Sequence, residues 1–363
     1  MSLARELHKK GARKITILER GRLGRESSFA AAGILAPNAE AERKDDFYNF
    51  CSESKELYTN FAAQLFAETG VNIELDRNGT LYLAFSERDA AEIRRRFEWQ
   101  KNAGLAVERL SAEEVRKAEP FVSPDVREAL FFPNDWQVEN RRILLALQKY
   151  AALNNIEIVE NTEVKNLITE NGKIIGVEIS GEKIFAETVA LATGAWTSLI
   201  KSRENNLFLP NVKPIRGQIL SFRTAKRLFS KVIYTSRGYL VPRLDGRILV
   251  GATVEDVGYD KNTTESGLKF LLKIALEISP QLANLEILDR WAGLRPCAED
   301  GLPILGAFHE IENLYVATAH FRNGILLAPL TAKILADKII GNADSKYLEI
   351  FSPQRFEVMN YEC

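Results

Sequence analysis

The sequence predicts an α/β fold that joins a domain of alternating helices and strands to a second domain with a mixed or antiparallel sheet. Near the N-terminus a helix-like segment, residues 2–10, is followed by a buried strand, residues 14–19. In the middle of the chain, Asn171-Gly172 and Ser180-Gly181 are hairpin signals between short β-rich runs. Near the C-terminus the strand-like run 314–320 leads into an apolar helix. Alternation of this kind is typical of an α/β protein.

The other elements are predicted from apolar periodicity and from turn residues. Apolar residues recur at helical spacing in four further segments, 45–68, 87–103, 141–154 and 262–278. Strands are predicted at 80–85, 157–159, 164–169, 173–179, 183–192, 212–222 and 238–250, the last broken by a turn at Asp245-Gly246. Two arginines, Arg295 and Arg322, are predicted to lie in turns beside strand-like runs, where a planar guanidinium can bind a carboxylate.

Composition limits the function classes. The 363-residue chain has 46% hydrophobic residues, enough for a sizeable core in about two domains. Its formal charge of −1, with 48 Lys+Arg against 49 Asp+Glu, gives no basic surface for nucleic acid. Cys51, Cys297 and Cys363 are far apart and odd in number, which argues against a disulfide framework and favours a reducing, cytoplasmic location. We also predict no membrane span, because charges interrupt the longest apolar stretch, and no metal, because the three histidines lack ligand spacing.

The segment from the first helix to Glu19 has the order of a dinucleotide-binding unit whose first strand is missing. In such a unit a Gly-x-Gly-x-x-Gly loop precedes the helix, and an acid about 20 residues further on binds ribose hydroxyls. Glu19 occupies that place, and a solvated carboxylate at a strand end is the alternative. Two later segments favour nucleotide binding. Residues 25–37 combine hydroxyl and small side chains, and residues 188–196 form a strand that ends in a small-residue turn.

Together with residues 291–329, these segments resemble the D-amino-acid oxidase superfamily of FAD-dependent oxidoreductases, most closely its glycine-oxidising members in thiamine biosynthesis. The resemblance implies a non-covalently bound FAD and a Rossmann-like FAD-binding domain that lacks its first strand. It places this domain at residues 1–45, 140–215 and 290–345. The substrate-binding domain is expected at residues 46–139 and 216–289, followed by a C-terminal tail at 346–363.

The same resemblance assigns cofactor contacts residue by residue. Glu19 and Arg20 would flank the adenosine ribose, and Val164 would offer its backbone to adenine. The other expected contacts are Ser27 and Ser28 at the pyrophosphate or ribityl chain, Ala32, Gly33 and Ile34 along the isoalloxazine ring, and His320, Phe321, Arg322, Asn323, Gly324, Ile325 and Leu326 over the pyrimidine edge. Ordinary tight packing is the alternative explanation for the small residues among them.

Three residues are expected to act on the substrate. Arg295, in Gly-Leu-Arg-Pro, matches the arginine that takes the substrate carboxylate in a bidentate pair, and a surface ion pair is the alternative. Arg322 is expected near the flavin, in contact with substrate or cofactor. Tyr239 resembles the tyrosine that closes the pocket over the carboxylate, and a core tyrosine is the alternative. Cys297 departs from the family pattern, and we expect a buried inert thiol there rather than a covalent flavin link.

The reaction implied by the resemblance is oxidative deamination of glycine, sarcosine and small D-amino acids. Hydride passes from the amine to flavin, O2 is reduced to hydrogen peroxide, and an imine is formed. The partners are therefore a small amino acid or amine and O2, without nucleic acid or membrane, and the resemblance allows a homo-oligomer. The alternatives are a sarcosine-oxidase-like enzyme, a D-amino-acid dehydrogenase, or an N-terminally truncated, inactive flavoprotein.

The start of the chain bears on the last of these alternatives. The glycine loop expected before the first helix would offer backbone N–H groups to the pyrophosphate. Because the sequence begins after that point, we expect weak FAD binding or low stability, and a natural coding region that starts upstream of Met1.

Overall fold

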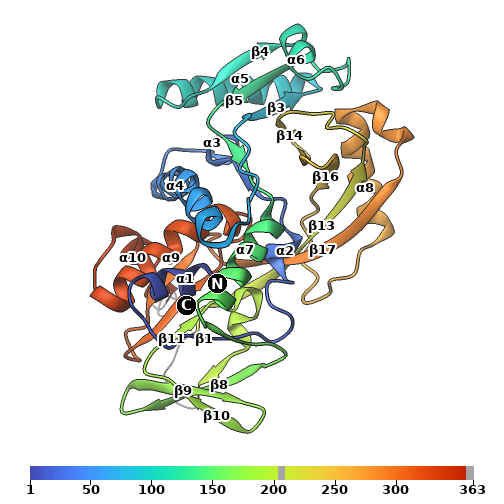
Figure 1. Cartoon of the computed structure of the whole chain (residues 1–363). Coiled ribbons are helices and arrows are strands. Elements are labelled where there is room, and N and C mark those ends of the chain that lie inside the picture. The colour runs from blue at the N-terminus through green and yellow to red at the C-terminus, as the bar shows by residue number, and fades with distance from the viewer. Residues whose placement is uncertain (203–208, 357–363) are drawn as a thin grey trace.

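The largest unit of the fold is an eight-stranded sheet (Figure 1). The computed structural model describes residues 1–202 and 209–356, so Cys363 lies outside the described residues. The strand order is β17 (Ile287–Ala298), β13 (Val212–Arg223), β16 (Arg247–Gly251), β15 (Tyr239–Pro242), β14 (Val232–Tyr234), β3 (Thr80–Ala84), β5 (Glu128–Phe132) and β4 (Glu108–Ser111). Neighbouring strands are antiparallel except for the parallel pair β14 and β3, so the sheet is mixed. The predicted mixed α/β fold class is confirmed.

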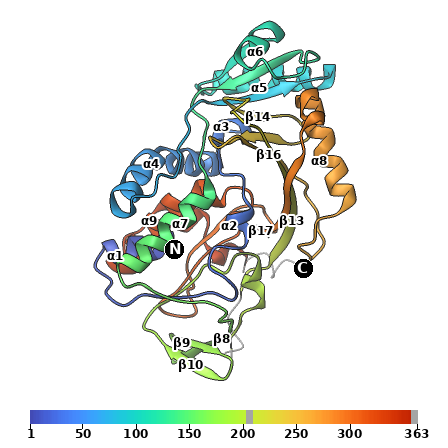
Figure 2. The same cartoon turned by 45° about the vertical axis from the view of Figure 1, so that its right-hand side comes forward.

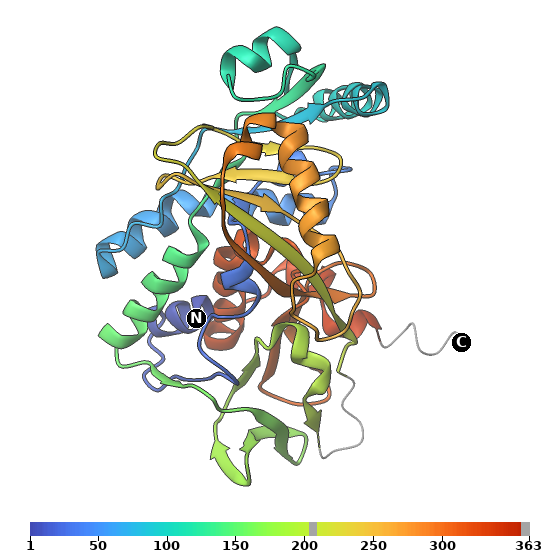
Figure 3. The same cartoon turned by 90° about the vertical axis from the view of Figure 1, so that its right-hand side faces the viewer.

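Side chains alternate between the two faces of this sheet, so each face has its own core. On β13, Leu220 points to the face that packs with α8 (Glu265–Ile278), which lies across the sheet in Figure 3. The adjacent Ile219 belongs to the other core, together with Tyr239 of β15 and Ala32. The face turned away from α8 therefore carries part of the predicted cofactor segment.

Smaller sheets complete the fold. A parallel pair is formed by β1 (Thr16–Leu18) and β7 (Glu157–Val159), and an antiparallel pair by β2 (Ile34–Leu35) and β6 (Trp136–Gln137). A three-stranded sheet has the order β11 (Val189–Leu191), β19 (Leu314–Thr318) and β18 (Ile304–Ala307). A four-stranded sheet has the order β10 (Glu182–Phe185), β9 (Lys173–Ile179), β8 (Val164–Glu170) and β12 (Lys201–Ser202).

The single strand predicted at residues 183–192 is wrong, because the structure forms two strands in two different sheets. β10 pairs with β9, whereas β11 pairs with β19. The connecting residues, Ala186-Glu187-Thr188, carry no large apolar side chain that would hold them in either sheet. The hairpins at Asn171-Gly172 and Ser180-Gly181 are confirmed, with both residues of each turn at positive φ.

The predicted long helices are confirmed. They are α1 (Ser2–Lys9), α4 (Asp46–Thr69), α5 (Glu87–Asn102), α7 (Asn140–Leu153), α8 and α9 (Gly324–Gly341). α4 packs against α7 and α9 (Figure 2), around a core that also takes in Tyr347 and Phe351. The short helices were not predicted, namely α2 (Ser27–Ala30), α3 (Pro37–Glu40), α6 (Ala112–Ala118) and α10 (Lys346–Ile350). Among the described residues, no helix combines the length and the apolar composition that crossing a bilayer requires.

The two predicted domains are joined by continuous elements. α4 was assigned to the substrate-binding domain, but it packs on α7 and α9 of the other unit. Strands β13 and β17 pair along their length, and the predicted boundaries at 215 and 290 fall inside them. The domain boundaries therefore stay a prediction.

Arg295 lies inside strand β17 rather than in a turn, which corrects one prediction. The strand continues without a break through Arg295 and Pro296 and pairs with β13. Pro296 suggested a turn because proline lacks a backbone N–H donor. β17 is the edge strand of its sheet, and an edge strand tolerates proline. Arg322 does lie in the predicted turn, between β19 and α9.

Candidate active site

A large cavity, with a volume of about 1640 Å³, is lined by β1, β11, the N-terminus of α9 and the second face of the large sheet. The predicted site residues that line it are Glu19, Arg20, Ser27, Ser28, Ala32, Gly33, Ile34, Val164, Tyr239, Arg295, His320, Phe321, Arg322, Asn323, Gly324 and Ile325. Leu326 is the exception, because its side chain is buried in the helical core. The cavity exceeds the roughly 300–1,000 Å³ typical of small-ligand pockets, so it can hold a ligand of dinucleotide size.

An acid, a cation and an aromatic ring meet at the end of β1. Glu19 accepts a hydrogen bond from the backbone N–H of Gly21 at 3.0 Å. The guanidinium of Arg20 lies 4.0 Å from the centre of the Trp196 ring and 3.6 Å from a carboxylate oxygen of Glu26. These contacts hold both predicted side chains at the cavity wall, where hydroxyl groups of a ribose could bind.

The segment between α2 and α3 forms a wall of the cavity that is made largely of backbone. Gly33 has a φ of +65°, and a Cβ built there would lie 2.0 Å from the carbonyl oxygen of Val138. Arg243 donates to the carbonyl oxygens of Ala32 at 2.9 Å and Val138 at 2.6 Å. Only glycine fits this close approach. A planar ring can therefore lie against this segment, the platform (Ala32, Gly33 and Ile34).

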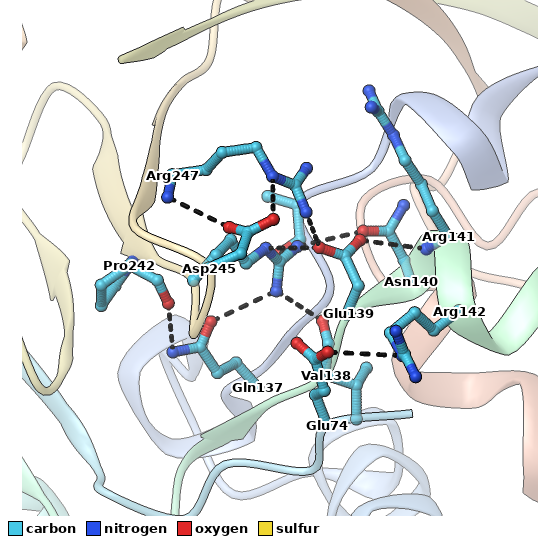
Figure 4. Close-up of polar contacts among 12 residues, drawn as sticks. Glu74, Gln137, Val138, Glu139, Asn140, Arg141, Arg142, Pro242, Asp245 and Arg247 are labelled. Carbon is cyan, nitrogen blue, oxygen red and sulfur yellow. Dashed lines mark hydrogen bonds and ion pairs between the residues drawn. The ribbon is translucent and has the colours of Figure 1, made fainter. Parts of the chain in front are cut away.

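Arg243 belongs to a buried polar network that joins the β15–β16 hairpin to the start of α7. Figure 4 shows the polar contacts around Glu139, Asn140 and Arg247 in this network. Its guanidinium donates to Asn140 Oδ1 at 3.0 Å and to Gln137 Oε1 at 3.3 Å. The carboxylate of Glu139 lies 3.4 Å from Arg243 and 2.6 Å from Arg247. Burial acts to raise the pKa of Glu139, but the two arginines prevail and hold this pKa below its ordinary value.

The loop between β19 and α9 forms another wall. Ala319 and Phe321 have φ values of +56° and +44°, a conformation that residues with side chains adopt at a cost. The backbone N–H of Phe321 donates to the carbonyl of Pro296 at 2.9 Å, which ties the loop to β17. No side-chain cap covers the N-terminus of α9 among the described residues, and Gly324 and Ile325 line the cavity. An electron-rich ligand edge fits this positive helix end.

His320 and Cys297, which could serve as a base and a nucleophile, are both in their neutral forms near pH 7. Burial lowers the pKa of His320 to about 4, and its Nε2 lies 3.1 Å from Thr331 Oγ1. Cys297 is half-buried rather than buried as predicted, yet loss of solvation raises the pKa of its thiol, whose sulfur lies 3.4 Å from the carbonyl oxygen of Ala298. Cys297 is not among the residues that line the cavity. Its thiol is therefore not placed for covalent attachment to a ligand there.

A largely enclosed positive charge lies in the part of the cavity next to the large sheet. Gly217 leaves space for the guanidinium of Arg295, since a Cβ there would lie 2.2 Å from one of its nitrogens. That group donates to the carbonyl oxygen of Thr253 at 3.1 Å. Burial lowers the pKa of Arg295 and the neighbouring phenol of Tyr239 acts to raise it, yet an arginine stays protonated in a protein. In the described part of the chain no carboxylate pairs with Arg295, so it can receive an anion.

Sequence analysis missed two residues of this site, Glu40 and Tyr234. Glu40 is the last residue of α3 and lines the cavity. Its Oε1 accepts hydrogen bonds from the hydroxyl of Tyr234 at 2.7 Å and from Arg322 at 3.2 Å. Glu40 raises the pKa of Arg322, against the effect of burial. The only signal in the sequence was an acid directly after the small-residue segment, and this alone does not indicate a site.

A buried carboxylate anchors the short helix that carries Glu40. Asp135 is 0% exposed and accepts hydrogen bonds from the backbone N–H groups of Asn38 at 3.2 Å and Ala39 at 2.7 Å. The side-chain amide of Asn38 donates to the same carboxylate at 2.7 Å. Burial raises the pKa of Asp135 to about 7, although these hydrogen bonds act in the opposite direction.

Asp135 is expected to make stability depend on pH near neutrality. The pKa of Asp135 in the folded state lies above the unfolded value of about 3.9. Its protonated form therefore stabilises the fold fully below pH ~4, and this contribution to the free energy of unfolding is lost as pH rises through 7. Between pH 5.5 and 8.5 this loss amounts to roughly 2 kcal/mol. Thermal unfolding of wild type and Asp135→Asn across that range measures it, and lowering the pH should stabilise wild type relative to Asp135→Asn by this amount. The exposed Asp125→Asn serves as control, and parallel pH profiles for all three proteins would contradict the assignment.

The chain is similar to known proteins over most of its length. The family profile described as FAD dependent oxidoreductase matches residues 1–338. Glycine oxidase of Bacillus subtilis (strain 168) is 33% identical over 346 residues, which are 94% of this chain and 91% of that protein. The bifunctional protein ThiO/ThiG of Trichormus variabilis is 33% identical over 98% of this chain and 53% of its own length. The crystal structure of glycine oxidase from Geobacillus kaustophilus has a TM-score of 0.91 at 30% identity, covering 97% of this chain and 94% of that one.

Proposed function

The chain belongs to the FAD-dependent oxidoreductase family, and we propose that it oxidatively deaminates glycine and other small amines or amino acids. The overall reaction converts glycine, O2 and water to glyoxylate, ammonia and hydrogen peroxide. Sarcosine and small D-amino acids are expected as further substrates. The similarity to ThiO/ThiG supports a role of the imine product in thiamine biosynthesis.

The lining of the cavity fits FAD. Glu19, Arg20 and Val164 would hold the adenosine, and Ser27 and Ser28 would lie along the chain that joins it to the ring. The platform and the residues from His320 to Ile325 would enclose the ring system, with the uncapped N-terminus of α9 facing its electron-rich edge. Bound FAD supplies the two-electron acceptor that oxidation of an amine requires.

The observation that carries the proposal is the guanidinium of Arg295, which lies beside the phenol of Tyr239 and has no carboxylate within ion-pair distance in the described part of the chain. Arginine binds a carboxylate through two parallel hydrogen bonds, which fix the orientation of the ligand as well as its position. Burial raises the pKa of Tyr239, so its hydroxyl stays protonated and can donate to the same carboxylate. Held in this way, an amino acid has its carboxylate and its α-carbon in fixed places, and positioning of this kind lowers the barrier to reaction.

The cysteines support a non-covalent cofactor and a reducing compartment. Cys51 and Cys297 are free thiols, and Cys297 is absent from the cavity lining. A thiol becomes nucleophilic as the thiolate, and the raised pKa of Cys297 disfavours that form. We therefore expect the flavin to be released by acid precipitation, and we place the enzyme in the cytoplasm.

Turnover is expected to fall as the side chain of the substrate grows. Tyr239 lines the cavity, and its ring packs in the core of the sheet with its centre 5.7 Å from that of Tyr234, which restricts its movement for a bulky group. Oxygen uptake and hydrogen peroxide yield should be measured with glycine, sarcosine, D-alanine and D-phenylalanine. Faster turnover of D-phenylalanine than of glycine would replace the proposal by a general D-amino-acid oxidase, and oxidation of glycine without peroxide would replace it by a dehydrogenase.

A further inference from the structure

The charges around the substrate end of the cavity are unequally paired. Two guanidinium groups line it, those of Arg295 and Arg322. Arg322 has a carboxylate partner, Glu40, at 3.2 Å, whereas Arg295 has none in the described part of the chain. We propose that Glu40 restricts the enzyme to substrates with a single carboxylate, because it neutralises Arg322 and leaves one cation free. The inference rests on the proposed function, since it specifies which amino acids that site accepts.

Glu40 is held in place by contacts that do not depend on a substrate. The hydroxyl of Tyr234 donates to Glu40 Oε1 at 2.7 Å. The Tyr234 ring is buried in the same hydrophobic core as Ala32 of the platform. Asp135 fixes the two residues before Glu40 through their backbone and side-chain N–H groups. The carboxylate can therefore stay beside Arg322 when a ligand enters.

The net charge of Arg295, Arg322 and Glu40 limits the number of carboxylates that a substrate can carry. With Arg322 and Glu40 paired, Arg295 is the one uncompensated positive charge among these three groups. A substrate with one carboxylate neutralises Arg295. A second carboxylate would have to displace Glu40 from Arg322 or lie beside it, and like charges brought together in a poorly solvated site discriminate strongly against a ligand. Removing the charge of Glu40 frees Arg322 to bind that second carboxylate.

Glu40→Gln tests the proposal with little disturbance of the structure. Both hydrogen bonds go to the same oxygen, Oε1, and a glutamine oxygen can accept them while the negative charge is lost. The substrates are two matched pairs, glycine with iminodiacetate and D-alanine with D-aspartate. In each pair kcat/KM for the dicarboxylate, relative to the monocarboxylate, is expected to rise on the order of tenfold or more.

Two further variants show whether the effect comes from Arg322. Glu42→Gln makes the same change of charge two residues away, at an exposed position outside the cavity, and is expected to leave both ratios at the wild-type value. Combining Glu40→Gln with Arg322→Met should abolish the gain, because the released cation is then missing. Glu40→Ala gives a second route to the charge loss if the glutamine variant folds poorly.

Ligand binding gives a readout that does not need turnover. In calorimetric titrations of the oxidised holoenzyme, Glu40→Gln is expected to bind malonate about tenfold more tightly than wild type, with a smaller gain for acetate, because Glu40 also attracts Arg295. Unchanged substrate ratios together with unchanged malonate affinity would overturn the role of Glu40. If wild type oxidises none of the amines, the proposed function fails, and the malonate and acetate titrations still decide the inference.

Discussion

Arg295→Ala is expected to lower kcat/KM for glycine roughly a hundredfold or more, because a desolvated carboxylate loses its bidentate partner. This corresponds to a loss of about 3 kcal/mol of transition-state stabilisation. The loss should reside in turnover and substrate affinity and not in the fold. The guanidinium donates a hydrogen bond to the protein backbone, at Thr253, and forms no ion pair among the described residues. Steady-state oxygen uptake at varied glycine concentration measures the change, and the flavin-to-protein ratio should equal that of wild type.

A matched control lies on the same strand. Arg290 is also in β17, but it is exposed and pairs with Glu265 at 3.0 Å on the protein surface. Arg290→Ala removes the same charge and the same number of atoms, and its effect on kcat/KM should stay within about 0.5 kcal/mol. Wild-type kcat/KM in Arg295→Ala would show that the substrate carboxylate is bound elsewhere.

Elements whose cause is local were predictable from the sequence. The Asn171-Gly172 hairpin was predicted because two consecutive positive φ values favour that residue pair, whatever surrounds it. The turn at Arg322 followed in the same way from an apolar strand, a short polar loop and an apolar helix. Arg295, predicted to bind the substrate carboxylate, does line the cavity, but the strand on which it lies was missed. Whether Pro296 ends a strand depends on which side of it is paired, and pairing with β13 is a long-range property.

The missed site residues depend on contacts between distant parts of the chain. Glu40 is 194 residues from Tyr234 and 282 residues from Arg322 in sequence, and only the folded chain brings their side chains together. The same holds for Arg243, whose acceptor Ala32 is 211 residues away. A pattern within one segment predicts the element on which a residue lies, but it carries no information about the partner that gives the side chain its role.

Arg243→Met is expected to lower the free energy of unfolding by about 3–5 kcal/mol and to reduce FAD retention. The arginine is 3% exposed and donates to four acceptors, Ala32 O, Val138 O, Asn140 Oδ1 and Gln137 Oε1. Methionine can fill part of the volume, but it offers no donor, so these buried acceptors lose their partner and Glu139 loses one of its two cations. Because two of the acceptors are the carbonyls that hold the platform, the loss should reach the flavin site.

The measurement is urea unfolding of the purified holoprotein together with its flavin-to-protein ratio after gel filtration. Arg223→Met serves as the control, because Arg223 is exposed and lies on β13, the strand next to β16, where it is opposite Arg247. Arg223→Met should lower the free energy of unfolding by no more than about 0.5 kcal/mol. A double variant with Glu139→Gln should be less unstable than the sum of the single changes, since the carboxylate that Arg243 compensates is then neutral. Equal unfolding free energies and equal flavin content in Arg243→Met and Arg223→Met would mean that the platform is held by backbone packing at Gly33 alone.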